Sequence, residues 1–292
     1  PDEKGGAKMY RNDGGKFVDI SRAAGIYSSV IGFGLGITCG DINVDGWPDL
    51  YISNDFHERD YLYLNNQKGG FRECLPEYFD QISLSSMGAD LADLNNDGLP
   101  EIFSTDMLPG NDRRLKQLTT FQNFDTYQKR LQLDYFHQFT SNMLQLHNGF
   151  SAAGALLPFS EVGEMAGVEA TDWSWGALMA DFDNDSRRDL LVCNGIYKDV
   201  TDQDFLNFLS NDANMEAAMR GEKVNFQQWI SKIPSEKIPN CLFTRTGEEL
   251  TFKNAAAAWG LGEPSFSNGA AYGDLDNDGD LDLVFASIDR EG

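Results

Sequence analysis

Four short segments of this 292-residue chain repeat one arrangement of oxygen-bearing side chains. They begin at Asp41, Asp93, Asp181 and Asp274, and each carries Asp or Asn at position 3, Asp at position 5 and Asp or Glu at position 9. Carboxylate and amide oxygens at these spacings, completed by the carbonyl of position 7, suit a hard cation that takes about six to eight oxygen ligands. The pattern predicts calcium loops, numbered 1 to 4 in chain order, with up to four Ca²⁺ ions.

The predicted calcium ligands are side-chain oxygens at four positions of each loop and a main-chain carbonyl at a fifth. The side chains are Asp41, Asn43, Asp45, Asp49, Asp93, Asn95, Asp97, Glu101, Asp181, Asp183, Asp185, Asp189, Asp274, Asp276, Asp278 and Asp282, and the carbonyls are those of Trp47, Leu99, Arg187 and Asp280. Glycine at position 6 lets the backbone turn, but loop 3 has Ser186 there, in a conformation that costs more for a residue with a side chain. The simpler alternative is a set of acidic turns without metal.

An EF-hand begins with the same spacing, but it needs a bidentate glutamate at position 12 and a helix on either side. Position 12 is occupied by Ile52, Ser104, Val192 and Phe285 in the four loops. Each loop is followed by a short apolar run that is typical of a buried strand. The loops are therefore expected to join strands.

The repeat extends beyond the loops. A glycine lies five residues before each first aspartate, at Gly36, Gly88, Gly176 and Gly269, and marks a strand ahead of the loop. Third and fourth strands are expected ahead of loop 1 and between successive loops, and a Phe-to-Gly spacing of eight residues marks the fourth strand in three copies. Four strands per repeat describe one blade of a β-propeller, so the predicted fold class is all-β.

The unit Gly-x-x-x-x-Asp-x-[Asp/Asn]-x-Asp-Gly-x-x-Asp, with Phe33-Gly34 ahead of its first copy, resembles the FG-GAP/VCBS repeat of integrin α-subunit propellers and many bacterial surface proteins. Residues 10–25 (Tyr-Arg-Asn-x-Gly-Gly-x-Phe-x-Asp-Ile-x-x-x-Ala-Gly) are similar to the branch associated with UnbV/ASPIC domains. The resemblance implies a calcium-binding propeller whose ligand binds on the face opposite the calcium loops.

Blade-sized repeats divide the chain into five predicted segments. They are 1–29 (the last two strands of a preceding blade), 30–80 (loop 1), 81–169 (loop 2), 170–264 (loop 3) and 265–292 (the first two strands of a next blade, with loop 4). Because propellers close with about four to eight blades, we expect the chain to be an incomplete segment of a larger propeller.

Two insertions, at residues 110–140 and 202–233, are expected to be helical because their apolar residues recur at three and four positions. Asp202 or Asp204 is expected to cap the second one. Both insertions fall between the second and third strands of their repeats. We therefore expect them at the face opposite the calcium loops.

Three residues are weaker candidates for ligand contacts on that opposite face. His57 lies in a short connection between strands, where an exposed loop histidine without a role is the alternative. Trp173 and Trp175 lie just before a first strand, where packing between blades is the alternative. His137 is expected in a helical stretch that packs against the propeller, and His147 at the end of a strand.

Composition restricts the partners. A formal net charge of −23 and a pI near 4.3 argue against nucleic-acid binding, because the chain has no basic stripe to neutralise phosphates. No membrane span is expected in this segment. The cysteines, Cys39, Cys74, Cys193 and Cys241, have no paired spacing and are expected to be free and buried. Calcium loops of this kind suit an extracellular or cell-envelope location, where calcium is abundant.

Two function hypotheses follow, with a third as a plainer alternative. The chain is expected to be a calcium-stabilised extracellular or cell-envelope module that binds a protein or glycan on the insertion face, with no catalytic residues. An enzyme that cleaves polysaccharide on a propeller scaffold is the competing hypothesis, and a structural spacer in an envelope complex is the third. A central pocket that brings together His57 or paired carboxylates would favour the enzyme, whereas a broad surface built by the insertions would favour the binding module.

Overall fold

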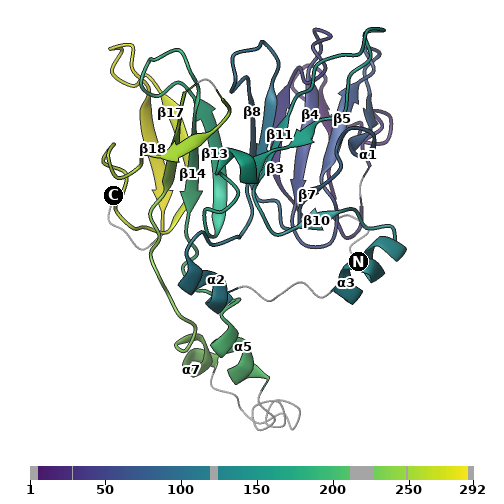
Figure 1. Cartoon of the computed structure of the whole chain (residues 1–292). Helices are drawn as coiled ribbons and strands as arrows, with labels where there is room; N and C mark the ends of the chain where they lie inside the picture. Colours follow the sequence, from purple (N-terminus) through teal and green to yellow (C-terminus); the bar gives the residue numbers. More distant parts are fainter. Residues whose placement is uncertain (1–5, 28, 119–123, 211–225, 248, 289–292) are drawn as a thin grey trace.

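The computed structural model describes residues 6–27, 29–118, 124–210, 226–247 and 249–288. Three antiparallel four-stranded sheets lie side by side (Figure 1). Blade 1 has the order β3 (Gly34–Gly40), β4 (Asp49–Asn54), β5 (Tyr61–Asn65), β6 (Phe71–Glu73); blade 2 has β8 (Ala89–Ala92), β9 (Glu101–Ser104), β11 (Met143–Leu146), β12 (Ser160–Glu161); blade 3 has β13 (Ser174–Ala180), β14 (Asp189–Asn194), β15 (Cys241–Arg245), β16 (Phe252–Asn254). The predicted all-β, propeller-like fold is confirmed.

Three two-stranded sheets accompany the blades. The antiparallel pairs are β1 (Tyr10–Asn12) with β2 (Phe17–Asp19), and β17 (Ser267–Gly273) with β18 (Asp282–Ser287). The third pair, β7 (Ile82–Ser83) with β10 (Gln138–Phe139), is parallel and was not predicted. It joins the end of the first insertion to the chain that precedes β8.

The first strands of neighbouring blades approach closely at the glycines that the sequence singled out. A Cβ atom on Gly88 would lie 2.4 Å from the carbonyl oxygen of Trp175 and 3.2 Å from the Cα atom of Gly176. A Cβ atom on Gly36 would lie 2.8 Å from the carbonyl oxygen of Met87. Because the backbone of the next blade fills the place of a side chain, these positions require glycine.

The hydrophobic core lies between the blades, and each blade is buried on both faces. On β14, Leu190 and Val192 pack in the cluster shared with blade 2, while Leu191 packs in the cluster shared with β17 and β18. On β4, Tyr51 packs toward blade 2 and Ile52 toward the segment that contains β1 and β2. The apolar runs that follow each loop are therefore central strands with alternate residues on opposite faces.

The acidic loops and the insertions lie at opposite ends of the blades, as predicted (Figure 1). The insertions contain α2 (Asp112–Leu118), α3 (Phe124–Gln132), α5 (Gln203–Leu209) and α7 (Phe226–Ile230). Two short helices, α1 (Leu75–Tyr78) and α4 (Gly163–Ala166), follow the fourth strands of blades 1 and 2. The carboxylate of Asp202 accepts the N–H of Phe205 and caps α5, as expected. Part of the second predicted helical segment, residues 211–225, lies outside the described residues.

Two expectations about single residues are wrong. His137 is not helical: α3 ends at Gln132, and His137 directly precedes β10, where its Nδ1 hydrogen-bonds the hydroxyl of Tyr127 at 2.6 Å. The apolar residues around His137 fit a short strand as well as a helix, so their spacing could not decide between the two. Cys39 is exposed rather than buried, although all four cysteines are free. In the described part of the chain, no helix is long and apolar enough to cross a membrane.

Candidate metal centres

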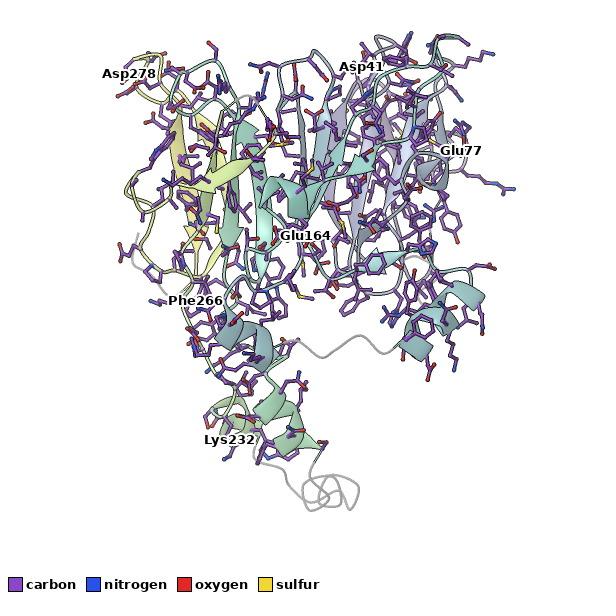
Figure 2. The ribbon with its side chains drawn as sticks, viewed as in Figure 1. Asp41, Glu77, Glu164, Lys232, Phe266 and Asp278 are labelled. Atoms are coloured by element: carbon purple, nitrogen blue, oxygen red, sulfur yellow. The ribbon has the colours of Figure 1, made fainter. Side chains whose placement is uncertain are left out.

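The four acidic loops occupy equivalent places in the fold. They connect β3 to β4, β8 to β9, β13 to β14 and β17 to β18, each between the first and second strands of its sheet. Figure 2 labels Asp41 of loop 1 and Asp278 of loop 4, which lie at the same end of the molecule, with Lys232 at the other. Each hairpin brings its position 1 and position 9 side chains together, because these residues flank the paired ends of the two strands.

Backbone N–H groups hold the carboxylates of each loop in place. In loop 1, Asp41 accepts the N–H groups of Asp45 and Gly46 at 2.9 and 2.8 Å, and Asp45 accepts the N–H of Trp47 at 2.9 Å. The same bonds recur in the other three loops. The loops are therefore four copies of one local structure, in which the side chains at positions 1 and 5 are already oriented by the backbone.

The last ligand position closes each loop in the same manner. Asp49, Glu101, Asp189 and Asp282 each accept the N–H of the residue at position 2, at distances of 2.8 to 3.2 Å. Glu101 reaches this N–H despite its additional methylene, at 2.8 Å. A glutamate therefore takes the same structural place as the aspartates.

The backbone turns twice through the left-handed region in every loop. Position 4 has a φ of 55° to 62°, and position 6 has 69° at Ser186 and 84° to 94° at the three glycines. Ser186 therefore adopts the unfavourable conformation that the sequence predicted.

Loops 3 and 4 bring three carboxylates close enough for one cation. Oxygens of Asp181, Asp183 and Asp189, and likewise of Asp274, Asp276 and Asp282, lie within 4.8 Å of one another. Oxygens that bind Ca²⁺ at about 2.3 to 2.6 Å can be at most about 5 Å apart. The donor set and its spacing fit calcium, a hard cation that prefers carboxylate and carbonyl oxygens.

In loops 1 and 2 an amide replaces the carboxylate of position 3. Asn43 donates through its Nδ2 to Asp45 at 3.2 Å, and Asn95 donates to Asp97 at 3.1 Å. The amide oxygen of each accepts the N–H of position 5 and faces the same way as the aspartate oxygens of loops 3 and 4. The oxygen set is thus conserved in kind among the four loops.

In loops 1, 2 and 3 the position 9 carboxylate has a raised pKa. Burial, together with nearby loop carboxylates, raises the pKa of Glu101 and of Asp189 to about 7. Burial also raises the pKa of Asp49. By contrast, the pKa of Asp45 is lowered, first by the hydrogen bond from the side chain of Gln67. Loops 1, 2 and 3 thus concentrate negative charge around one buried carboxylate, a distribution that a divalent cation would stabilise.

Of the weaker candidates for ligand contacts, the two tryptophans lie beside each other at β13, and His57 belongs to blade 1. His57 is exposed in the β4–β5 connection, with its ring centroid 6.0 Å from that of Tyr135. Trp173 is only 9% exposed, and Trp175 donates its indole N–H to the carbonyl of Gly195 at 2.8 Å. The ring centroids of the two tryptophans are 6.4 Å apart. These contacts hold the tryptophans against blade 3.

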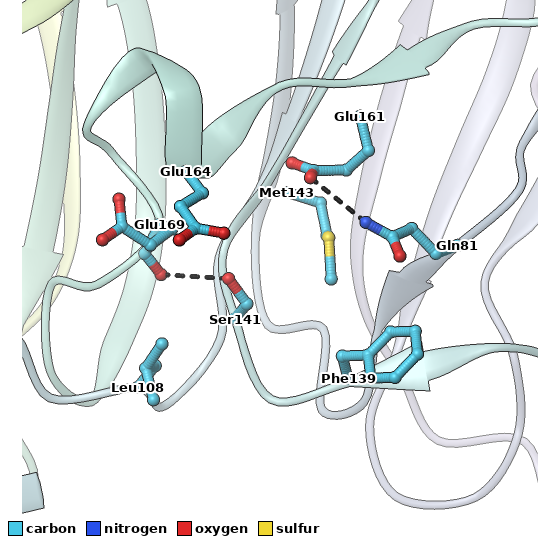
Figure 3. A pocket seen from close by; sticks show the side chains of 8 residues that line it. All are labelled: Gln81, Leu108, Phe139, Ser141, Met143, Glu161, Glu164 and Glu169. Carbon is cyan, nitrogen blue, oxygen red and sulfur yellow. Dashed lines mark hydrogen bonds between the residues drawn. The ribbon is translucent and has the colours of Figure 1, made fainter.

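A groove of about 400 Å³ opens on blade 2 (Figure 3). Its lining residues are Gln81, Leu108, Phe139, Ser141, Met143, Glu161, Glu164 and Glu169. Glu161 accepts the N–H groups of Leu144 and Gly163 and the side-chain amide of Gln81, so its charge is stabilised within the blade. His57, Trp173 and Trp175 do not line this groove.

Sequence reasoning missed a buried ionic cluster that joins the first insertion to the chain beside the second. Arg114 of α2 is 4% exposed and forms a bidentate pair with Asp172, at 2.6 and 2.8 Å. The same guanidinium contacts Asp199 at 3.1 Å and Glu236 at 3.2 Å. The partners lie 58 to 122 residues away in the chain, so no local pattern marks them. The first insertion is thereby fixed onto the chain that precedes β13 and onto the chain on either side of the second insertion.

A second unpredicted feature is a polar junction at the insertion end of the blades. The residue before each third strand accepts a backbone N–H from the end of the second strand or just beyond it, at 2.7 to 3.0 Å: Asp60 from Asn54, Asn142 from Asp106 and Asn240 from Asn194. Asp60 is the one acid among the three. It is fully buried and also accepts the hydroxyls of Tyr51 and Ser86. Burial raises the pKa of Asp60 to about 7.

Comparison with known proteins gives the same assignment. The FG-GAP-like repeat family matches residues 41–104, which run from the first aspartate of loop 1 to the last residue of β9 and include loop 2. Residues 41–104 of this chain therefore form an FG-GAP-like repeat region. The chain is also similar to human integrin alpha-7, with 39% identity over 87 residues, which represent 24% of this chain and 7% of integrin alpha-7. The aligned part is thus a small fraction of that relative's length. The narrower resemblance to the UnbV/ASPIC-associated branch stays a prediction.

Proposed function

We propose that this chain is a calcium-stabilised binding module of the propeller type, located outside the cytosol or in the cell envelope. The observation that carries the proposal is the fourfold recurrence of one oxygen-lined loop between the first two strands of each sheet. The similarity to integrin alpha-7 supports the assignment to a binding module.

The proposed role of calcium is structural. The ligands are the side chains at positions 1, 3, 5 and 9 and the carbonyl at position 7 of each loop. When bound, Ca²⁺ would neutralise carboxylates that otherwise repel one another. The loop residues contribute a shape that the backbone N–H groups already define. Binding only to the folded state would stabilise the fold, because the unfolded chain holds no such arrangement of oxygens.

The proposed recognition surface is the insertion face, which carries α2, α3, α5 and α7 (Figure 1). Buried ion pairs of Arg114 with Asp172 and Asp199 fix α2 of the first insertion to the chain that precedes β13 and to the chain that leads into the second insertion. Exposed apolar side chains occur at the same end, including Phe56 and Phe33, whose ring centroids are 5.3 Å apart. A protein or a glycan is the proposed ligand.

Two matched variants test which face binds. Phe56 and Val44 are both exposed, and both have a positive φ, of 66° and 55°. Phe56 lies beside His57 in the β4–β5 connection, whereas Val44 lies in loop 1. Phe56→Ser and Val44→Ser would be screened with calcium against immobilised glycans and purified extracellular proteins. The proposal expects Phe56→Ser to lose any ligand that Val44→Ser retains, and the reverse result would place recognition on the calcium-loop face.

A further inference from the structure

Side chains link neighbouring calcium loops directly. Position 4 of loop 2 is Asn96, whose Nδ2 donates to the carbonyl oxygen of Ser186 in loop 3 at 2.8 Å. Position 4 of loop 3 is Asn184, whose Nδ2 donates to the carboxylate of Asp280 in loop 4 at 2.6 Å. The same residue type, at the same loop position, thus reaches across to the next blade twice.

The conformation of the donor residue at position 4 depends on the order of its own loop. Position 4 lies between the predicted ligands of positions 3 and 5, so fixing those two side chains on one ion also fixes the backbone of position 4. Asn96 and Asn184 have φ values of 62° and 59°, in the left-handed region. Asparagine tolerates this conformation better than most residues. The orientation of each amide therefore depends on how well its own loop is ordered.

The acceptor position is equally well placed to influence the next loop. Ser186 is position 6 of loop 3 and holds an unfavourable φ of 69°. Asp280 is position 7 of loop 4, whose carbonyl is a predicted ligand. The first bond thus holds the residue between the predicted ligands at positions 5 and 7 of loop 3, and the second holds the residue at position 7 of loop 4. A third contact runs the opposite way, from Arg188 of loop 3 to the carbonyl oxygen of Asp93 in loop 2, at 3.1 Å.

We propose that loops 2, 3 and 4 bind calcium cooperatively, with the amides of Asn96 and Asn184 as the links. The inference rests on the proposed calcium function and adds its regulation. An ion in one loop orders the amide that steadies the next loop, so the next ion binds to a site whose ordering cost is already reduced. Coupling of this kind is reciprocal and is typically at least about fivefold in affinity.

The chain supplies a matched control for the two links. Asn277 is position 4 of loop 4, has a φ of 62°, and makes no hydrogen bond to another loop among the described residues. Replacing any of the three asparagines by glycine removes the amide but keeps the left-handed conformation. Asn96→Gly and Asn184→Gly break a link, whereas Asn277→Gly makes the same chemical change without breaking one.

The test titrates calcium into EDTA-stripped protein and follows the amide NMR signals of Gly98 and Gly279, the position 6 residues of loops 2 and 4. Loop 3 is disabled by Asp181→Asn with Asp183→Asn. The proposal expects this change to weaken calcium binding at both glycines about fivefold. In the Asn184→Gly background the Gly279 midpoint no longer responds to loop 3, while the Gly98 midpoint still does. Asn96→Gly gives the converse, and Asn277→Gly leaves both responses intact.

Unchanged midpoints at Gly98 and Gly279 when loop 3 is disabled would overturn the coupling while leaving calcium binding established. An equal response in all three glycine variants would also overturn it, because the amides would then not be the links. If calcium moves neither glycine signal in the unaltered protein, the proposed calcium function itself fails. The two failures are therefore distinguishable in one experiment.

Discussion

Replacing Asp60 by asparagine should remove a pH-dependent loss of stability. Asp60 is fully buried at the junction between blades 1 and 2, and all its hydrogen-bond donors are neutral: the N–H of Asn54 and the hydroxyls of Tyr51 and Ser86. Burial, with a smaller contribution from the nearby Asp106, raises its pKa from 3.8 to about 7. Asn142 and Asn240 take the equivalent place in blades 2 and 3, so asparagine suits this site.

The direction in which stability changes with pH follows from proton linkage. Because the folded state holds the proton more tightly than the unfolded state, the stability that Asp60 contributes is complete below about pH 4 and is lost as the pH rises through about 7. A difference of about three pKa units at about 1.4 kcal/mol per unit limits the loss to about 4 kcal/mol. The unaltered protein should therefore lose up to this amount relative to Asp60→Asn between pH 4 and pH 8.

Urea unfolding at several pH values, with calcium constant, measures the effect. The quantity to compare is the difference in unfolding free energy between Asp60→Asn and the unaltered protein, because the loop carboxylates titrate in this range in both. Asp80→Asn is the control, since Asp80 is exposed, and it should show no such trend. A difference between Asp60→Asn and the unaltered protein that stays constant with pH would refute the argument, because Asp60 would then titrate as a solvated carboxyl group.

Three further substitutions have defined outcomes in urea unfolding. Arg114→Met should cost about 3 to 5 kcal/mol because it leaves Asp172 and Asp199 buried without their cation, whereas Arg113→Met, which breaks an exposed pair, should cost less than about 1 kcal/mol. Gly88→Ala should cost about 1 to 3 kcal/mol or more, since its Cβ would lie 2.4 Å from a backbone oxygen, while Gly269→Ala, with no atom within 4 Å, should be tolerated. Ser186→Gly should stabilise the protein by up to about 1 kcal/mol, because it relieves a left-handed serine. The reasoning would be contradicted if Arg114→Met or Gly88→Ala were as stable as its control variant, or if Ser186→Gly were only as stable as the unaltered protein.

Local patterns carried most of the fold prediction. The acidic loops, the strands that flank them and the placement of both insertions between second and third strands follow from motifs that repeat within about ten residues. Glycine at Gly36 and Gly88 could be recognised as special from its spacing. The reason that these positions need glycine, which is the close approach of the next blade's backbone, is visible only in the structure.

Features that depend on distant pairing could not be predicted. Arg114 meets Asp172 and Asp199 across 58 and 85 residues, and nothing in the neighbourhood of any of them distinguishes it from a surface charge. Asp60 precedes a strand like many solvated aspartates, and only its burial gives it a perturbed pKa. The parallel pair of β7 and β10 involves two residues per strand, too few for a periodic pattern.

Calcium stoichiometry and thermal unfolding, measured together on EDTA-stripped protein, test the central claim most directly. The account predicts up to four bound ions, one for each loop that is occupied, and a melting temperature that rises with calcium. At a free calcium concentration of 100 times Kd, each site adds about 2.7 kcal/mol. Absence of binding together with an unchanged melting temperature would contradict the account and leave four acidic turns held by their own hydrogen bonds.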